Sequence, residues 1–444
     1  MRPLGIDLFA GAGGLSLGFE QAGFDVAAAV EVDPVHCAVH KFNFPDTATI
    51  PHPIETLVGA DILKAARIDG RRVDCVFGGA PCQGFSLIGH RALDDPRNGL
   101  VRDFVRVVGE IEPRTFVFEN VKGLTVGRHR KFLDELIHEF SRIGYVVRVP
   151  WRVLNAAHFG TPQNRERLIL LGARKGDSPP AYPAPLTEIP SPQQRIVGLP
   201  EGPTCSDALG DLPDVDEIEE LVASDSTAIA DFGEPSEYAA LLRCLSDHAW
   251  HYGHPREWDP DVLTSSARTE HTAISRRRFR DTEPGTVEPI SRFFKLSERG
   301  VSNTLRAGTD GARGAFTSPR PIHYLYDRCI TVREMARLHG FPDWFRFNVT
   351  KWHGGRQIGN SVPPPLARAI AGQVMRALGA TATRPSVPVS LGDPGLLSLD
   401  LSGAAKHFGV EPPPSRRDKK SGVRKRRQID IERERLNGLV GARA

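Results

Sequence analysis

The chain has 444 residues, of which 25% are charged, and its formal net charge is +3. This length suits two or three domains, and no apolar run is long enough to cross a bilayer, so a membrane-spanning protein is not expected. The six cysteines form no CxxC pair and the N-terminus shows no signal peptide, so we expect a reduced, cytoplasmic protein rather than a disulfide-linked secreted one.

The first predicted unit is a strand at 4–9, a glycine-rich turn from Ala10 to Gly18, and a helix to about Ala22. This order is typical of a nucleotide-binding α/β unit. Ser16 stands where a GxGxxG motif would have its third glycine, which disfavours a dinucleotide and favours another adenosine cofactor. A second strand at 26–30 ends at Glu31, about where an acidic side chain accepts hydrogen bonds from ribose. Taken without Glu31, the turn could be purely structural.

Asp61 and Ile62 follow another turn. The Asp61 carboxylate could accept from an adenine amino group, although capping a helix is the more ordinary role for an aspartate there. The next strand, at 73–77, is interrupted by Gly78 and Gly79, and Pro81 then precedes Cys82. A cysteine on a loop that leaves a buried strand lies where open α/β sheets bind ligands, and a thiolate is a strong nucleophile. The alternative is a buried structural cysteine.

A helix opens at 97–100 and runs to about Ile111, and a strand at 115–119 ends in Glu119 and Asn120. A carboxyl group at this edge is a candidate for acid chemistry, because burial would raise its pKa; a helix cap is the alternative. Strands are then expected at 145–154 and 168–172. Between them, Arg165 and Arg167 would point the same way in an extended segment and could hold a carbonyl oxygen or a phosphate. An exposed salt-bridged pair is the bland alternative.

Six motifs in this order resemble the C5-cytosine DNA methyltransferase family. They are Asp7-Leu-Phe-Ala-Gly-Ala-Gly-Gly14, Gly79-Ala-Pro-Cys-Gln-Gly-Phe-Ser86, Glu119-Asn-Val121, Gln163-Asn-Arg-Glu-Arg167, Thr331-Val-Arg-Glu-Met-Ala-Arg-Leu-His-Gly-Phe-Pro342 and Gln357-Ile-Gly-Asn-Ser-Val-Pro-Pro364. The resemblance covers about 4–171 and 297–378. Val32 departs from it, because many members have an aromatic residue after the ribose-binding glutamate.

The resemblance implies a flipped cytosine in duplex DNA, attack of Cys82 on C6, and methyl transfer from S-adenosylmethionine to C5. Glu119 would bond N3 and the amino group, Arg167 and less directly Arg165 would hold O2, and Pro81 and Asn120 would shape the cysteine loop. The cofactor residues implied are Phe9, Gly11, Gly13, Gly14, Glu31, Val32, Asp61, Ile62, Leu100, Asn360, Ser361 and Val362. Gln83 and Ser86 are expected to contact DNA.

Between about Lys175 and Leu296 the composition changes to clustered prolines, an acidic run at 211–220 and a basic run at 276–280. In the family this interval holds the target-recognition domain. Arg276, Arg278 and Arg280, interleaved with an aromatic residue, suit DNA phosphates, although a solvated charged face is also plausible. One cysteine and three histidines at 244–254 fit no standard zinc spacing, so no metal is expected.

Charge also gathers at the C-terminus. Between Arg416 and Arg443 there are eleven Lys/Arg and four Asp/Glu, a net of +7, which leaves −4 for the rest of the chain. A segment so poor in apolar bulk is expected to be disordered and suited to phosphates. Any DNA affinity of the body must then come from local patches.

The expected fold is a Rossmann-like α/β methyltransferase domain, with a mostly parallel sheet and helices on both faces, plus a smaller target-recognition domain. We expect catalytic residues in 1–174, the target-recognition region at 175–296, a junction and return to the catalytic domain at 297–380, and a linker with a basic tail at 381–444. The predicted protein is a monomeric DNA (cytosine-5-)-methyltransferase, with a cognate restriction endonuclease as a possible companion. Alternatives are a tRNA cytosine-5 methyltransferase, a catalytically inactive DNA-binding relative, and a NAD-dependent oxidoreductase, which the glycine spacing disfavours.

Overall fold

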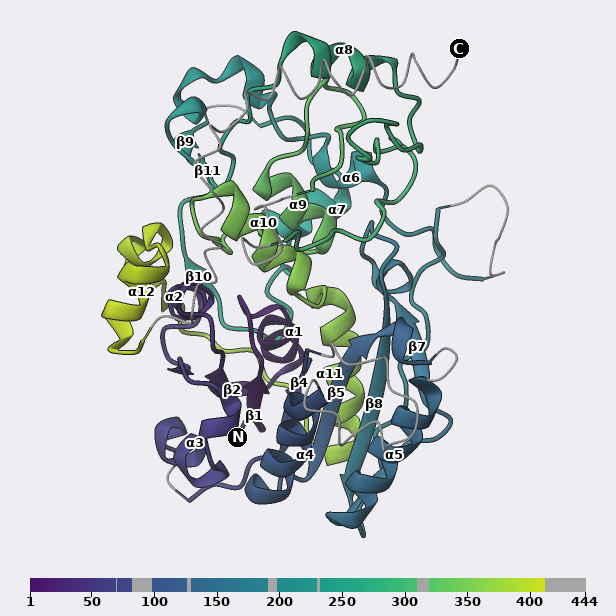
Figure 1. Cartoon of the computed structure of the whole chain (residues 1–444), viewed down its shortest axis with the longest axis vertical. Coiled ribbons are helices and arrows are strands. Elements are labelled where there is room, and N and C mark those ends of the chain that lie inside the picture. Colours follow the sequence, from purple (N-terminus) through teal and green to yellow (C-terminus); the bar gives the residue numbers. More distant parts are fainter. Residues whose placement is uncertain are drawn as a thin grey trace, which may run out of the picture.

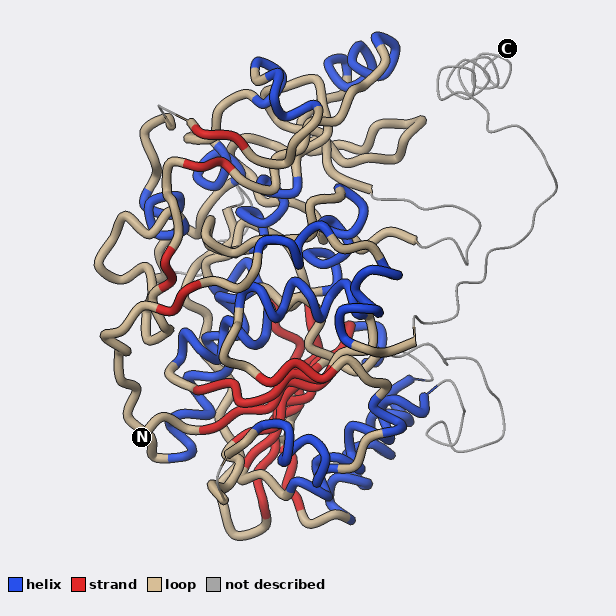
Figure 2. Tube along the Cα trace, turned by 90° about the vertical axis from the view of Figure 1, so that its left-hand side faces the viewer, coloured by secondary structure: helices blue, strands red, loops and turns tan. Residues whose placement is uncertain are grey.

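The computed structural model describes residues 1–68, 70–81, 98–125, 129–190, 198–229, 232–309 and 319–411. One lobe is a sheet flanked by helices, and a loop-rich second lobe occupies the other end of the molecule (Figure 1). In the view turned by 90°, the strands gather in the lower lobe with helices on both sides (Figure 2).

The eight-stranded sheet has the order β3-β2-β1-β4-β5-β8-β6, with β7 also paired to β8. Neighbouring strands from β3 to β5 are parallel, and β8 is antiparallel to β5, β6 and β7. Strand order reverses between β1 and β4, so the carboxyl ends there form the edge at which doubly wound sheets bind ligands. The strands are β1 (Leu4–Leu8), β2 (Asp25–Val30), β3 (Ala48–Ile50), β4 (Cys75–Gly78), β5 (Thr115–Val121), β6 (Tyr145–Val147), β7 (Arg152–Asn155) and β8 (Glu166–Arg174).

Both faces of the sheet are covered, which explains why its strands are apolar at nearly every position. Side chains alternate between the faces along each strand. In β5, Phe116 and Phe118 join one core, together with α3 (Gly59–Ala66), α4 (Gly99–Ile111) and α5 (His129–Arg142). Val117 joins the opposite core, which contains α1 (Gly14–Ala22) and α11 (Pro364–Leu378). The return of the chain end to the first glycine-rich unit, expected from the sequence, is therefore confirmed.

The expected strand at 145–154 is wrong, because it is two strands. β6 ends at Val147, β7 begins at Arg152, and both pair with β8. Pro150 lies in the interruption and has no N–H to donate to a ladder, which accounts for the break.

The second lobe has its own core, which draws on residues from Cys205 to Phe347 and on α2 (Pro34–Asn43) of the first lobe. This core therefore continues past the expected boundary at 296. Its elements are α6 (Cys205–Leu209), β9 (Thr227–Ala228), α7 (Glu237–Leu242), β10 (Arg256–Glu257), β11 (Val262–Leu263), α8 (Ala273–Asp281), α9 (Val332–His339) and α10 (Lys351–Asn360).

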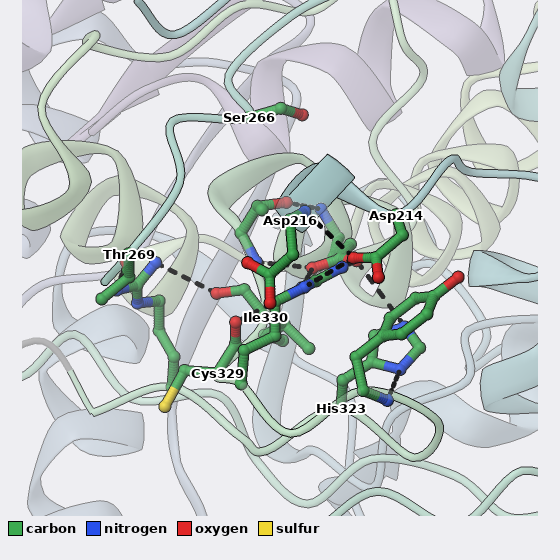
Figure 3. A network of polar contacts seen from close by, with 12 residues as sticks. Asp214, Asp216, Ser266, Thr269, His323, Cys329 and Ile330 are labelled. Atoms are coloured by element: carbon green, nitrogen blue, oxygen red, sulfur yellow. Dashed lines mark hydrogen bonds and ion pairs between the residues drawn. The ribbon is translucent and has the colours of Figure 1, made fainter. Parts of the chain in front are cut away.

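A buried polar network braces this lobe (Figure 3). Arg328 donates to both oxygens of Glu334 at 2.9 Å, and its Nε lies 3.4 Å from Asp214. Both members of the Arg328–Glu334 pair are almost fully buried. The arginine holds the pKa of Glu334 down to about 2 against the opposing effect of burial. Since Glu334 also caps α9 through the Thr331 N–H at 2.6 Å, this pair fixes where that helix begins.

The expected linker from Thr381 is wrong as far as Gly409. β12 (Val389–Ser390) pairs with β10, and α12 (Leu401–Phe408) packs on α2. Leu396 and Leu397 are buried, which gives this segment the apolar anchor that its composition obscured. The basic tail at 412–444 lies outside the described residues. Among the residues that are described, no helix is long and apolar enough to span a membrane.

Candidate active site

The glycine-rich turn joins β1 to α1 at the carboxyl edge of the sheet. Gly13 has a φ of 104°, and a Cβ there would come within 2.5 Å of the Phe44 ring, so only glycine fits. A Cβ on Gly14 would collide with the Val362 carbonyl and the Ser361 side chain. The turn is therefore pressed against the segment that follows α10, which unites two motifs far apart in the sequence.

Glu31 closes the side of this turn. Its carboxylate accepts from the Gly11 N–H and from the Asp33 N–H, both at 2.9 Å. These two bonds hold the acid at the end of β2 over the glycine-rich turn, and its position there is the one expected for a ribose acceptor. Val32, next in sequence, is 49% exposed and offers an apolar surface at the same edge.

The other expected cofactor residues surround the same edge less tightly. Phe9 and Leu100 pack against the core that contains the buried Ile62. Asn360 is exposed. Asp61 is exposed and accepts from the Val58 N–H at 3.3 Å, so in this structure it acts as the helix cap that was the alternative interpretation.

A second group of polar side chains lies where β4, β5 and β8 meet. Arg167 stands opposite Val121 in the β5–β8 register, so its side chain is on the same face as Glu119 two residues away. Its Nε lies 2.7 Å from Glu119 Oε1, and both side chains are 12% exposed. Burial raises the pKa of Glu119, while the guanidinium groups of Arg167 and Arg165 oppose that rise.

The loop that carries the predicted nucleophile leaves β4 beside this pair. A Cβ on Gly79 would collide with Glu119 Oε2, so the glycine allows the loop to pass directly over the carboxyl group. Asn120 Nδ2 donates to the Ala80 carbonyl at 2.9 Å, which fixes the backbone just before the exposed Pro81. Cys82, Gln83 and Ser86 lie outside the described residues.

Arg165 differs from the expected substrate contact. It is 1% exposed, and its terminal nitrogens donate to the carbonyls of Leu305, Gly359 and Ser361 at 3.0, 2.8 and 2.8 Å. The two arginines therefore do not converge on one site. Only Arg167 reaches Glu119.

The three arginines of α8 are engaged within the second lobe, at the end of the molecule away from the sheet (Figure 1). Arg276 lies 2.7 Å from Asp216, Arg278 lies 3.6 Å from a carboxylate oxygen of Glu288, and Arg280 lies 2.6 Å from Asp327. Of the three side chains, only that of Arg280 is largely exposed, at 68%. Their expected role as phosphate ligands stays a prediction.

The residues of the disfavoured zinc hypothesis turn to separate partners. His248 Nδ1 contacts Arg384, and His254 Nε2 lies 3.4 Å from Asp25. The described residues contain no group of three or more His, Cys, Asp or Glu arranged for a metal ion.

Sequence reasoning gave no role to several buried residues around the site. Asp7 accepts from the Ser16 hydroxyl at 2.7 Å, and Ser16 Oγ contacts His40 Nε2 at 3.1 Å, all three beneath the glycine-rich turn. Gln163 and His339 are also fully buried and bond each other at 2.9 Å. Four of these five lie inside the six motifs or their flanks, but a single sequence shows no partner for any of them.

Comparison with known proteins gives one consistent answer. A family model described as C-5 cytosine-specific DNA methylase matches residues 4–376. The Type II methyltransferase M.XorII of Xanthomonas oryzae pv. oryzae is 56% identical over 92% of this chain and 93% of its own length. The Type II methyltransferase M1.HphI of Haemophilus parahaemolyticus is 34% identical over 84% of this chain and 86% of its own length.

Solved structures agree. The crystal structure of a DNA modification methyltransferase described as encoded within a prophage of E. coli matches with a TM-score of 0.66 and 31% identity, over 85% of this chain and 99% of that one. The structure of S. pombe Dnmt2 methyltransferase matches with a TM-score of 0.50 and 17% identity, over 85% of this chain and 99% of that one, which supports the fold alone.

Proposed function

The chain belongs to the C-5 cytosine-specific DNA methylase family and is a DNA (cytosine-5-)-methyltransferase that uses S-adenosylmethionine; from this premise we propose how its residues divide the reaction. The observation that carries the proposal is the Glu119–Arg167 pair, which lies against the backbone of the loop leading to Cys82.

Cys82 is the nucleophile in this proposal. C5 of cytosine is a weak nucleophile, and inside a duplex it is out of reach, so the base is flipped into the pocket at a cost of a few kcal/mol. Cys82 sulfur bonds to C6 and electron density moves to C5, which then takes up the methyl group. Loss of the C5 proton followed by release of Cys82 restores the aromatic ring and leaves 5-methylcytosine.

Glu119 and Arg167 stabilise the charge that this addition pushes into the ring. Glu119 bonds N3 and the amino group, and burial, by raising its pKa, favours the protonated form that can donate to N3. Arg167 orients Glu119 and donates to O2. Asn120 and Pro81 set the start of the cysteine loop through the bond to the Ala80 carbonyl.

The residues at the carboxyl edge fit S-adenosylmethionine, which supplies an electrophilic methyl group when bound. The glycine-rich turn has no side chains that would obstruct an adenosine, and Glu31 is already oriented as an acceptor for the ribose hydroxyls. The apolar surface of Val32 would cover the adenine in place of an aromatic ring. Ser361 and Val362 close the site against Gly14.

Sequence recognition is proposed for the second lobe, 175–296 with its core continuing to Phe347, and sequence-independent phosphate binding for the basic tail. Duplex DNA rather than tRNA is favoured because relatives up to 56% identical are named Type II methyltransferases. The same names support a companion restriction endonuclease that cuts the methylated site. The presence of Glu119 and Arg167 in contact argues against an inactive relative.

The replacement Cys82→Ala tests the nucleophile assignment. Methyl transfer to DNA should be abolished, while S-adenosylhomocysteine should raise the melting temperature of the variant as much as that of the wild type. Cys244→Ala, at the half-buried cysteine of the second lobe, is the matched control and should keep the wild-type rate. A Cys82→Ala enzyme that retains more than a few per cent of the wild-type rate would remove Cys82 from the mechanism.

A further inference from the structure

A buried polar cluster joins four segments of the chain behind the site. Its members are Gln163 and Arg165, which precede β8, His339 at the end of α9, Ser361 after α10, and the backbone of Leu305. Gln163, Arg165 and His339 are each 1% exposed or less. Because water is excluded, every polar atom here depends on a protein partner, and the loss of one is costly.

The hydrogen bonds of this cluster define one arrangement. Gln163 Nε2 bonds His339 Nδ1 at 2.9 Å, and its Oε1 accepts from the Leu305 N–H at 3.1 Å. His339 Nε2 bonds the Ser361 carbonyl at 3.0 Å, and that carbonyl also accepts from Arg165 at 2.8 Å. A carbonyl only accepts, so His339 carries its proton on Nε2 and is neutral, in line with the burial that lowers its pKa well below the usual range.

Arg165 is the only cation at the centre of this cluster, and the described residues offer it no carboxylate in ion-pair contact. Its charge is balanced instead by the carbonyls of Leu305, Gly359 and Ser361. Gly359 is in the last turn of α10, where unpaired carbonyls and the helix dipole favour a cation. Arg165 thus caps α10 from within the protein, at a point where the chain leaves that helix for the cofactor-side turn.

The turn held by Arg165 has no slack on its other sides. A Cβ on Gly359 would collide with the backbone of Ala307, and the Val362 carbonyl lies where a Cβ of Gly14 would be. On the opposite flank, Arg167 is only two residues from Arg165 and carries the contact with Glu119. One short stretch of chain therefore faces the cytosine pocket with Arg167 and the cofactor turn with Arg165.

We propose that Arg165 is a positioning residue for the cofactor: held in register by Gln163 and His339, it fixes the 359–362 turn against the glycine-rich turn. The inference rests on the proposed cofactor role of residues 360–362 and gives Arg165 a task different from that of Arg167. Loss of Arg165 should weaken cofactor binding and leave the chemical step intact once cofactor is saturating.

The test compares Arg165→Lys with Arg167→Lys in the full-length enzyme. The Kd of S-adenosylhomocysteine is measured by calorimetry, and the rate of a single turnover is measured at saturating S-adenosylmethionine and DNA. Arg165→Lys should raise the Kd at least tenfold and keep the rate within threefold of wild type. Arg167→Lys should show the reverse. Arg174→Lys, at the exposed far end of β8, is the control and should change neither.

Two further measurements separate positioning from general loss of structure. Gln163→Ala keeps Arg165 but releases His339, and should raise the same Kd several-fold with an unchanged saturating rate. Ethylguanidinium should restore cofactor affinity to Arg165→Ala and have no effect on Arg167→Ala. Wild-type Kd values in both Arg165→Lys and Gln163→Ala would overturn the proposal. An Arg167→Lys enzyme with a wild-type rate would instead refute the cytosine-site assignment and leave the Arg165 result standing.

Discussion

Replacing Glu119 by Gln probes the charge-stabilising pair directly. The side chain keeps its size but loses the negative charge that orients Arg167 at 2.7 Å and the ability to donate to N3 as a protonated carboxyl. The pair is 12% exposed, so water cannot substitute for either group. Removing one group that stabilises developing charge in such a site costs about 10²–10³ in rate, which is about 2.7–4 kcal/mol.

The assay is a single turnover with a labelled methyl group at saturating DNA and cofactor. Glu166→Gln provides the control, because Glu166 bonds Lys122 at 2.8 Å in an exposed pair beside Glu119, and such pairs contribute about 0–1 kcal/mol. The control should keep the wild-type rate, and both variants should bind S-adenosylhomocysteine normally. If Glu119→Gln turns over within threefold of wild type, the carboxyl group does not touch the reacting base.

Three other outcomes follow from the described contacts and the tail. Burial raises the pKa of Asp7 from 3.8 to about 8, so the folded state retains a proton that the unfolded state loses and stability falls as pH rises between these values; the melting temperature of wild type relative to Asp7→Asn should fall from pH 4 to pH 8, and a constant difference would contradict this. Glu334→Gln leaves Arg328 buried without its charge partner and should lower the free energy of unfolding by about 3–5 kcal/mol in urea titrations, a loss under about 1 kcal/mol being incompatible with the pairing. Truncation after Pro414 removes ten Lys/Arg at 416–435 and should lower the salt slope of log K for DNA by several units, at about 0.9 per phosphate, with site preference unchanged; an unaltered slope would mean that the tail does not touch DNA.

Local patterns were enough to predict the catalytic lobe. Apolar strands ending in glycine, glutamate or asparagine identify the carboxyl edge of the sheet, and motif order predicts that both ends of the chain meet there. The contact between Glu119 and Arg167 needed more, because it depends on β8 running antiparallel to β5 in a register that brings the two side chains to one face. Neither direction nor register is visible in the sequence of either strand.

The differences arise where partners lie far apart in the chain. Arg165 reads as a substrate ligand because Arg167 is beside it, yet its three acceptors are 140–196 residues away. Arg276 reads as a phosphate ligand until Asp216, 60 residues earlier, is seen to hold it. The segment at 389–409 resembles a linker in composition, and two adjacent leucines are enough to anchor it once α2 offers an apolar surface.

Covalent trapping tests the central claim most directly. DNA with 5-fluorocytosine at the target position should react with the wild-type enzyme and S-adenosylmethionine to give a complex stable to detergent, because fluorine at C5 cannot leave as the proton does. Peptide mapping should find the nucleotide on Cys82, and Cys82→Ala should form no complex. A complex linked through another residue, or methylation of ordinary cytosine by an enzyme that 5-fluorocytosine never traps, would contradict the covalent mechanism proposed for this site.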